Sequence, residues 1–137
     1  MNEKYMTFGD YIRKKRQADP RELTMADVAK HLGISVSYVS EVENRRKRAF
    51  DGETLGRLAE FLNLTEEETA RLFDLAGREN RDVPYDIEDT LMYEEVGELA
   101  RYALRQSKKG VFKEEDWKTF IRETEEKNKK QQSNTNE

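Results

Sequence analysis

The sequence contains no cysteine, which excludes disulfide bonds and thiolate metal sites. Its one histidine, His31, has no second histidine or cysteine to complete a ligand pair, and we interpret it as a surface residue. We therefore predict no metal ion and no cofactor. The phosphate-binding loop, the dinucleotide-binding glycine motif and the zinc-protease motif are all missing. The acidic residues follow the spacing of solvated helical faces, so we expect no catalytic residue and no enzyme.

Long apolar runs are also missing. No segment approaches the length of a membrane span, and the N-terminus lacks the pattern of a signal peptide. Only 35% of the residues are hydrophobic, whereas 39% are charged. This balance is typical of a small, highly helical protein with a thin core, and we expect it in the cytoplasm and away from membranes.

The net charge of −4 is unevenly distributed along the chain. Residues 1–50 carry +4, residues 51–100 carry −11 and residues 101–137 carry +3. Salt screens surface charges beyond roughly 8 Å at physiological ionic strength, so local charge decides where a phosphate backbone can bind. The first third of the chain can therefore approach a nucleic acid, and the acidic middle is expected to face away from it.

Residues 24–44, TMADVAKHLGISVSYVSEVEN, have the pattern of two short helices joined by a tight turn. Thr24 and Ser35 suit the N-cap positions, because a hydroxyl there accepts a hydrogen bond from a free backbone N–H. Asp27 stands where a capping box usually has Glu. Gly33 falls where the first helix must end, in a left-handed conformation that glycine adopts cheaply.

The second of these helices sorts its residues by face. Val39 and Val42 fall together on an apolar side. The opposite side carries small or hydrogen-bonding residues, which suit a surface that enters a DNA major groove and contacts base edges. We predict the base-facing residues to be Val36, Ser37, Ser40 and Glu41.

A basic run, RRKR at residues 45–48, follows this helix directly. Its position favours contacts with DNA phosphates over a purely solubilising role. The predicted phosphate contacts are Tyr38, Asn44, Arg45, Arg46, Lys47 and Arg48.

The spacing of Ala29, Gly33 and Val39, together with SVSYVSEVEN at residues 35–44, resembles the helix-turn-helix of lambda-repressor/Cro-like proteins, the Xre family. The resemblance covers about residues 8–76. It implies an all-α fold with a five-helix DNA-binding domain, and a transcriptional regulator that binds double-stranded DNA as a homodimer.

The resemblance also carries two statements about single residues. It implies a structural ion pair between Arg16 and Glu43. The family often has Gln where this chain has Met25, and that Gln commonly contacts the DNA backbone. Met25 has no hydrogen-bonding group to replace it.

Apolar periodicity and capping residues predict five helices within residues 1–77, the first over 7–17 and the last ending at Gly77. Residues 1–6 are expected to be frayed. The remaining organisation is a linker at 78–83, a helical region at 84–127 and a disordered tail at 128–137. The pattern over 84–109 leaves open one helix or two.

The C-terminal helical region is predicted to be a hairpin that breaks at Gly110. Its apolar stripe is too large for the hairpin to cover alone, so we predict dimerisation through Leu99, Ala103, Trp117, Phe120 and Ile121. The alternatives are that the hairpin folds back on the first five helices, or that it binds another protein.

These patterns favour a repressor that binds an inverted-repeat operator as a homodimer. A second hypothesis is an antitoxin-type regulator whose C-terminal helices bind a toxin or an antirepressor. A third is a protein-interaction module that no longer binds DNA, which Met25, Glu41 and the acidic middle of the chain favour.

Overall fold

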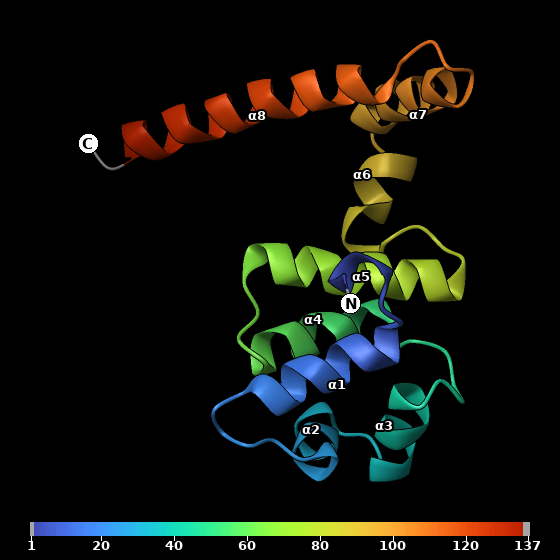
Figure 1. Ribbon diagram of the computed structural model, residues 1–137, viewed down its shortest axis with the longest axis vertical. Coiled ribbons are helices and arrows are strands. Elements are labelled where there is room, and N and C mark those ends of the chain that lie inside the picture. Colours follow the sequence, from blue (N-terminus) through green and yellow to red (C-terminus); the bar gives the residue numbers. More distant parts are fainter. Residues whose placement is uncertain (1, 136–137) are drawn as a thin grey trace. The chain divides into compact units, whose positions relative to one another are not determined.

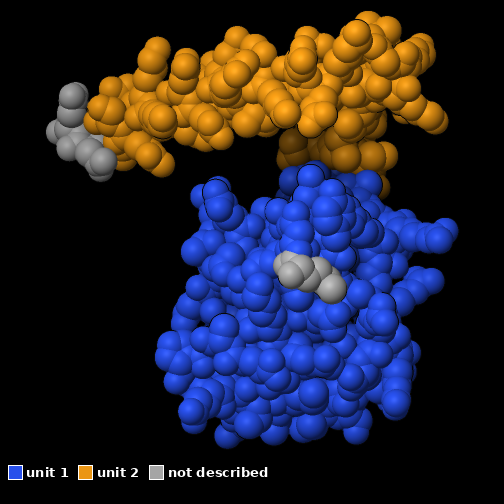
Figure 2. All heavy atoms as spheres, viewed as in Figure 1, with its two compact units in different colours: residues 1–89 blue, residues 90–137 orange. Residues whose placement is uncertain are grey.

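The computed structural model describes residues 2–135, and this part of the chain is helical without a strand (Figure 1). The predicted all-α fold is confirmed. In order, the elements are η1 (Glu3–Tyr5), α1 (Phe8–Ala18), α2 (Met25–Leu32), α3 (Val36–Glu43), α4 (Gly52–Phe61), α5 (Glu66–Asn80), η2 (Tyr85–Ile87), α6 (Glu88–Met92), α7 (Glu95–Lys108) and α8 (Glu114–Thr135). The chain divides into two compact units, residues 1–89 and residues 90–137 (Figure 2).

Each of the first five α-helices begins at a side chain that accepts a hydrogen bond from the backbone N–H three residues on. These N-cap residues are Thr7, Thr24, Ser35, Asp51 and Thr65. Asp27 and Glu68 complete capping boxes at the starts of α2 and α5. Each such cap stabilises its helix by about 1 kcal/mol, which fixes where the helices begin.

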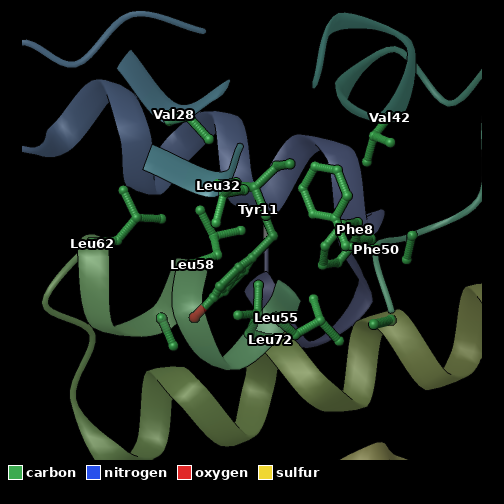
Figure 3. Close-up of a cluster of buried hydrophobic side chains, with 14 of the residues drawn as sticks. Phe8, Tyr11, Val28, Leu32, Val42, Phe50, Leu55, Leu58, Leu62 and Leu72 are labelled. Carbon is green, nitrogen blue, oxygen red and sulfur yellow. The ribbon is translucent and has the colours of Figure 1, made fainter. Parts of the chain in front are cut away.

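The core of unit 1 gathers side chains from α1 to α5 and from the loop before α4 (Figure 3). Phe8 meets Phe50 edge to face, with ring centroids 5.9 Å apart. Tyr11 is fully buried, and its hydroxyl donates a hydrogen bond to the Glu68 carbonyl at 3.0 Å, which ties α1 to α5. The five helices thus share one closed core.

Helices α1 and α3 approach each other closely at Gly9. A β-carbon at this position would overlap the Glu43 carbonyl oxygen and lie 2.8 Å from that of Val42. Only a residue without a side chain allows this contact, so Gly9 sets how closely the two helices pack.

The two ends of unit 1 differ from the sequence prediction. Residues 3–5 form a 3-10 turn rather than a frayed end, because the Glu3 carboxylate accepts from Lys14 at 2.8 Å. Helix α5 continues to Asn80 instead of ending at Gly77, and the predicted linker 78–83 overlaps its last turn. Arg81 then ends the helix in a left-handed conformation with φ of 54°.

The sequence left open one helix or two over residues 84–109, and the structure has two α-helices there, α6 and α7, after the turn η2. The chain breaks between α6 and α7 at residues 93–94, and the backbone of Gly97 packs against the carbonyls of Thr90 and Leu91. Gly110, at φ of 82°, lies in the turn between α7 and α8. Gly97 is the one fully buried residue among the described residues of unit 2.

Residues 128–135 of the predicted tail continue α8 as far as Thr135. No glycine or proline interrupts the chain after Gly110, and lysine and glutamine are strong helix formers. Residues 136–137 of the predicted tail lie outside the described part of the chain. Within the described residues, no helix is both long and apolar enough to cross a membrane.

Candidate nucleic-acid interface

Helix α3 presents one face to the core and one to the outside. Val39 and Val42 are completely buried. On the other side, Val36 is 48% exposed and Ser37 is exposed, while Ser40 and Glu41 are partly exposed. The structure therefore brings the four residues predicted to face bases together on one accessible face.

The turn between α2 and α3 sets the orientation of that face. Gly33 adopts a left-handed conformation with φ of 70°, and the Ile34 N–H donates to the Ala29 carbonyl at 3.0 Å. This bonding pattern ends α2 and turns the chain sharply toward Ser35. Helix α3 then starts on the Ser35 hydroxyl, which accepts from the Tyr38 N–H at 3.0 Å.

Glu43, at the end of α3, is a buried carboxylate with two arginine partners. It is 2% exposed. Arg16 contacts both of its oxygens, with Nε to Oε2 and Nη2 to Oε1 each at 3.0 Å. Arg13 adds a third contact, Nε to Oε1 at 3.3 Å. The two guanidinium groups compensate the buried charge. Because both arginines belong to α1, these contacts also hold α3 against α1.

The structure thus places Arg16 and Glu43 in contact, and adds Arg13, which the sequence interpretation did not include. Arg13 and Arg16 are three residues apart, so they share one face of α1. That spacing was the signal available in the sequence. It did not show that both guanidinium groups turn toward one carboxylate.

Asn44, predicted to contact phosphate, is exposed, and its side chain is hydrogen-bonded to other residues of unit 1. Its Oδ1 accepts from Arg13 Nη2 at 2.8 Å, and its Nδ2 donates to the Ser40 carbonyl at 2.9 Å. The same Nδ2 lies 3.3 Å from the Ser40 hydroxyl oxygen. Asn44 therefore closes the last turn of α3 and links it to α1.

The basic loop, residues 45–48, is exposed along its whole length. Arg45 has a left-handed backbone with φ of 61°, and the Arg46 N–H returns to the Glu41 carbonyl at 2.8 Å. Lys47 Nζ lies 3.8 Å from Glu41 Oε2, so one cation of the loop lies beside the predicted base-contacting carboxylate. The loop is followed by two buried residues, Ala49 and Phe50, which anchor its far end.

Tyr38 and Met25 flank this face and also support it. Tyr38 is partly buried, with its ring centroid 5.5 Å from that of Phe50. Met25 is partly buried and packs against the core. The side chain that replaces the family's usual Gln thus adds apolar contact beneath α2, a role that the sequence interpretation did not consider.

His31 is exposed and stacks on Phe61, with centroids 4.2 Å apart and planes 16° apart. Arg57 of α4 donates to the carbonyls of His31 and Leu32 at 2.9 and 3.2 Å. These contacts satisfy the free carbonyls at the end of α2. Arg57 was not singled out in the sequence, since its partner is a backbone group.

The residues predicted for dimerisation lie in unit 2 on an accessible surface. Leu99, Phe120 and Ile121 are 72%, 53% and 49% exposed. Trp117 is partly buried, and its Nε1 donates to the Ser107 hydroxyl at 2.8 Å, which orients the ring. Leu99, Trp117 and Phe120, together with Ala103, line an apolar groove of about 600 Å³ between α7 and α8.

Residues 12–68 match the family model described as helix-turn-helix, of the lambda-repressor/Xre type. This match spans α2, the turn and α3, and reaches from within α1 to the start of α5. Unit 1 is an Xre-type helix-turn-helix domain. No curated protein and no solved structure matches the chain.

The Xre domain makes this chain a DNA-binding transcription regulator. Domains of this family are regulatory and are not typically enzymatic.

Proposed function

We propose that the protein is a transcriptional repressor that acts in the cytoplasm and binds an inverted-repeat operator as a homodimer. The observation that carries this proposal is the accessible outer face of α3, which carries Val36 beside the polar Ser37, Ser40 and Glu41 and continues into an exposed basic loop. A surface of this kind can approach the floor of a major groove while its neighbouring cations contact the two phosphate backbones.

Val36 and Ser37 lead α3 into the groove, because they occupy its first turn. The exposed methyl groups of Val36 can contact a thymine methyl. Glu41, one helical turn further on, can accept a hydrogen bond from a cytosine amino group. Each such contact discriminates between bases by roughly 1–3 kcal/mol.

The phosphate contacts come from the basic loop. Arg45, Arg46 and Arg48 are exposed, and among the described residues the ion pair of the basic loop belongs to Lys47. Lys47 lies beside Glu41 and is a weaker candidate. The Tyr38 hydroxyl joins this set, whereas the Asn44 side chain acts by holding α3 in place.

Dimerisation is proposed for unit 2, because its apolar stripe is uncovered within the unit. Five residues of α7 and α8 illustrate this, with exposures from 49% to 72%: Val96, Leu99, Leu104, Phe120 and Ile121. A second copy related by two-fold symmetry offers the same stripe in return. Two tethered Xre domains also bind a palindrome more tightly than one, by roughly a hundredfold or more.

Footprinting on operator DNA selected from a random library tests this function. We expect two protected half-sites in inverted orientation, with centres about 34 Å apart or a multiple of this distance. Sedimentation without DNA should show a dimer at tens of micromolar. A single asymmetric footprint would contradict the operator geometry. A monomer that pairs only with another protein would instead support the toxin or antirepressor hypothesis.

A further inference from the structure

A cavity of about 300 Å³ opens in unit 1 beside the end of the basic loop, and none of the roles above uses it. Three aromatic side chains line it: Phe50, Phe73 and Tyr85. Phe50 and Phe73 are 1% and 7% exposed and belong to the core, whereas Tyr85 is 52% exposed. The volume lies at the lower end of the range for small-ligand sites, roughly 300–1,000 Å³.

Two glycines give this cavity its form. Gly52, the first residue of α4, lies directly beneath the Tyr85 ring, and a β-carbon there would overlap the ring. A β-carbon on Gly77 would lie 3.0 Å from the Asp82 carbonyl oxygen. Because neither position carries a side chain, residues 82–88 fold back onto α4 and α5 and form one wall of the cavity.

The lining is acidic. Asp51, Asp82 and Glu88 contribute carboxylates, and no lysine, arginine or histidine is among the lining residues that the structure describes. The Thr54 N–H donates to Asp51 at 2.9 Å and holds the pKa of that carboxyl below its usual range, so it is charged at neutral pH. Carboxylates without a facing cation give the cavity a negative potential.

One residue that lines this cavity has a buried acceptor atom without a donor among the described residues. Asn80 lines it and uses its Nδ2 on the Ala49 carbonyl, at 3.5 Å. Its Oδ1 is buried and has no hydrogen-bond partner among the described residues. Buried acceptors without donors are uncommon in folded proteins, and a ligand with an N–H group could satisfy this one.

We propose that this cavity binds a small organic cation with a flat apolar body, of the arylalkylamine class, in which an alkyl carbon joins the ring to a protonated amine. The ring fits among the three aromatic side chains, where stacking and edge contacts are favourable. The ammonium group offers three N–H donors and one positive charge, which complements the carboxylates and the unpartnered amide oxygen. The ligand would also contact Phe50, so binding there and the position of the basic loop are physically linked.

Titration of the full-length protein with benzylamine tests this proposal, with benzyl alcohol and benzoate as matched probes. We expect benzylamine to cause saturable NMR shifts at the amides of Gly52, Asn80 and Tyr85, with a dissociation constant of about 1 mM or tighter. Benzyl alcohol keeps the ring without the charge and should bind at least about tenfold more weakly. Benzoate reverses the charge and should not bind, because the carboxylates of the lining repel it.

Two variants test whether benzylamine binds at this cavity or is attracted to the acidic protein in general. Glu88→Gln removes one lining charge and should weaken benzylamine binding severalfold, whereas Glu60→Gln removes an exposed charge on α4 outside the lining and should leave it unchanged. Two results would overturn the proposal. One is equal binding of all three probes. The other is benzylamine shifts that never saturate or that spread over the acidic surface.

Discussion

Arg16 and Glu43, 27 residues apart in the sequence, join with two hydrogen bonds of 3.0 Å at a carboxylate that is 2% exposed. Removal of one member of a buried ion pair leaves an uncompensated charge, which costs roughly 3–5 kcal/mol. Here Arg13 remains as a second partner, so the loss should fall toward the lower end of this range. The pair determines how α3 lies against α1, and therefore how the side chains proposed to face DNA are presented.

We predict that Arg16→Ala lowers the free energy of unfolding by about 3 kcal/mol. Lys14→Ala is the control, since Lys14 is on the same helix but its pair with Glu3 is partly exposed, with side chains 49% and 33% accessible. That control should change stability by less than about 1 kcal/mol. Urea denaturation followed by circular dichroism measures both. Equal losses of stability in the two variants would show that the buried pair contributes no more to the free energy of unfolding than the Lys14–Glu3 pair.

Gly9→Ala should destabilise unit 1 by about 1–3 kcal/mol, because the new methyl group overlaps the Glu43 carbonyl. Gly56→Ala is the matched control. Gly56 lies inside α4, and a β-carbon added there would have no neighbour within 4 Å, so alanine should stabilise by about 0.5–1 kcal/mol. Thermal unfolding of both variants should give shifts of opposite sign. A stabilised Gly9→Ala variant would mean that α1 and α3 do not pack as closely as described.

Arg45→Gly should separate stability from DNA binding. Arg45 has a left-handed backbone, a conformation that costs a residue with a side chain roughly 1 kcal/mol, and glycine relieves this strain. The same substitution removes a proposed phosphate contact and should weaken binding and reduce the salt slope by about 1. Arg81→Gly relieves the same kind of strain at the end of α5 and serves as the control. It should raise the melting temperature without changing operator affinity.

Glu41→Ala and Arg46→Ala should affect DNA binding in different ways. Loss of the Glu41 carboxylate should change the preferred base at one position in each half-site, by roughly 1–3 kcal/mol. Loss of the Arg46 charge should instead weaken binding to all DNA sequences about equally and make binding less dependent on salt. Selection from a random DNA library distinguishes the two. An unchanged selected sequence for Glu41→Ala would exclude base contact by Glu41.

A chain that ends after Asp89 should keep a folded Xre domain but lose dimerisation. The end point follows from Tyr85, which covers Gly52, because an earlier cut would remove part of unit 1. We expect this shortened chain to sediment as a monomer and to bind its operator at least about tenfold more weakly. Trp117→Ala in the full chain should act in the same direction. A full-length protein that is already monomeric would contradict the proposed interface.

The sequence by itself determined the local features of this fold. The caps at Thr24, Ser35 and Thr65, the left-handed Gly33 and the buried faces of the first five helices all depend on residues within about four positions of one another. Such contacts recur at fixed spacing, so they can be recognised without a structure. The same is true of the outer face of α3, because one helical period places its four residues together.

Tertiary packing decided the rest. Arg13 contacts Glu43 and Asn44 across about thirty residues, and only the crossing of α1 over α3 brings them together. The sequence predicts a linker that ends at residue 83 and a helical region from residue 84, yet the bare backbones of Gly52 and Gly77 let residues 82–88 pack onto unit 1 and form a cavity. Contacts between distant segments depend on how whole helices pack, and no local spacing in the sequence encodes that geometry.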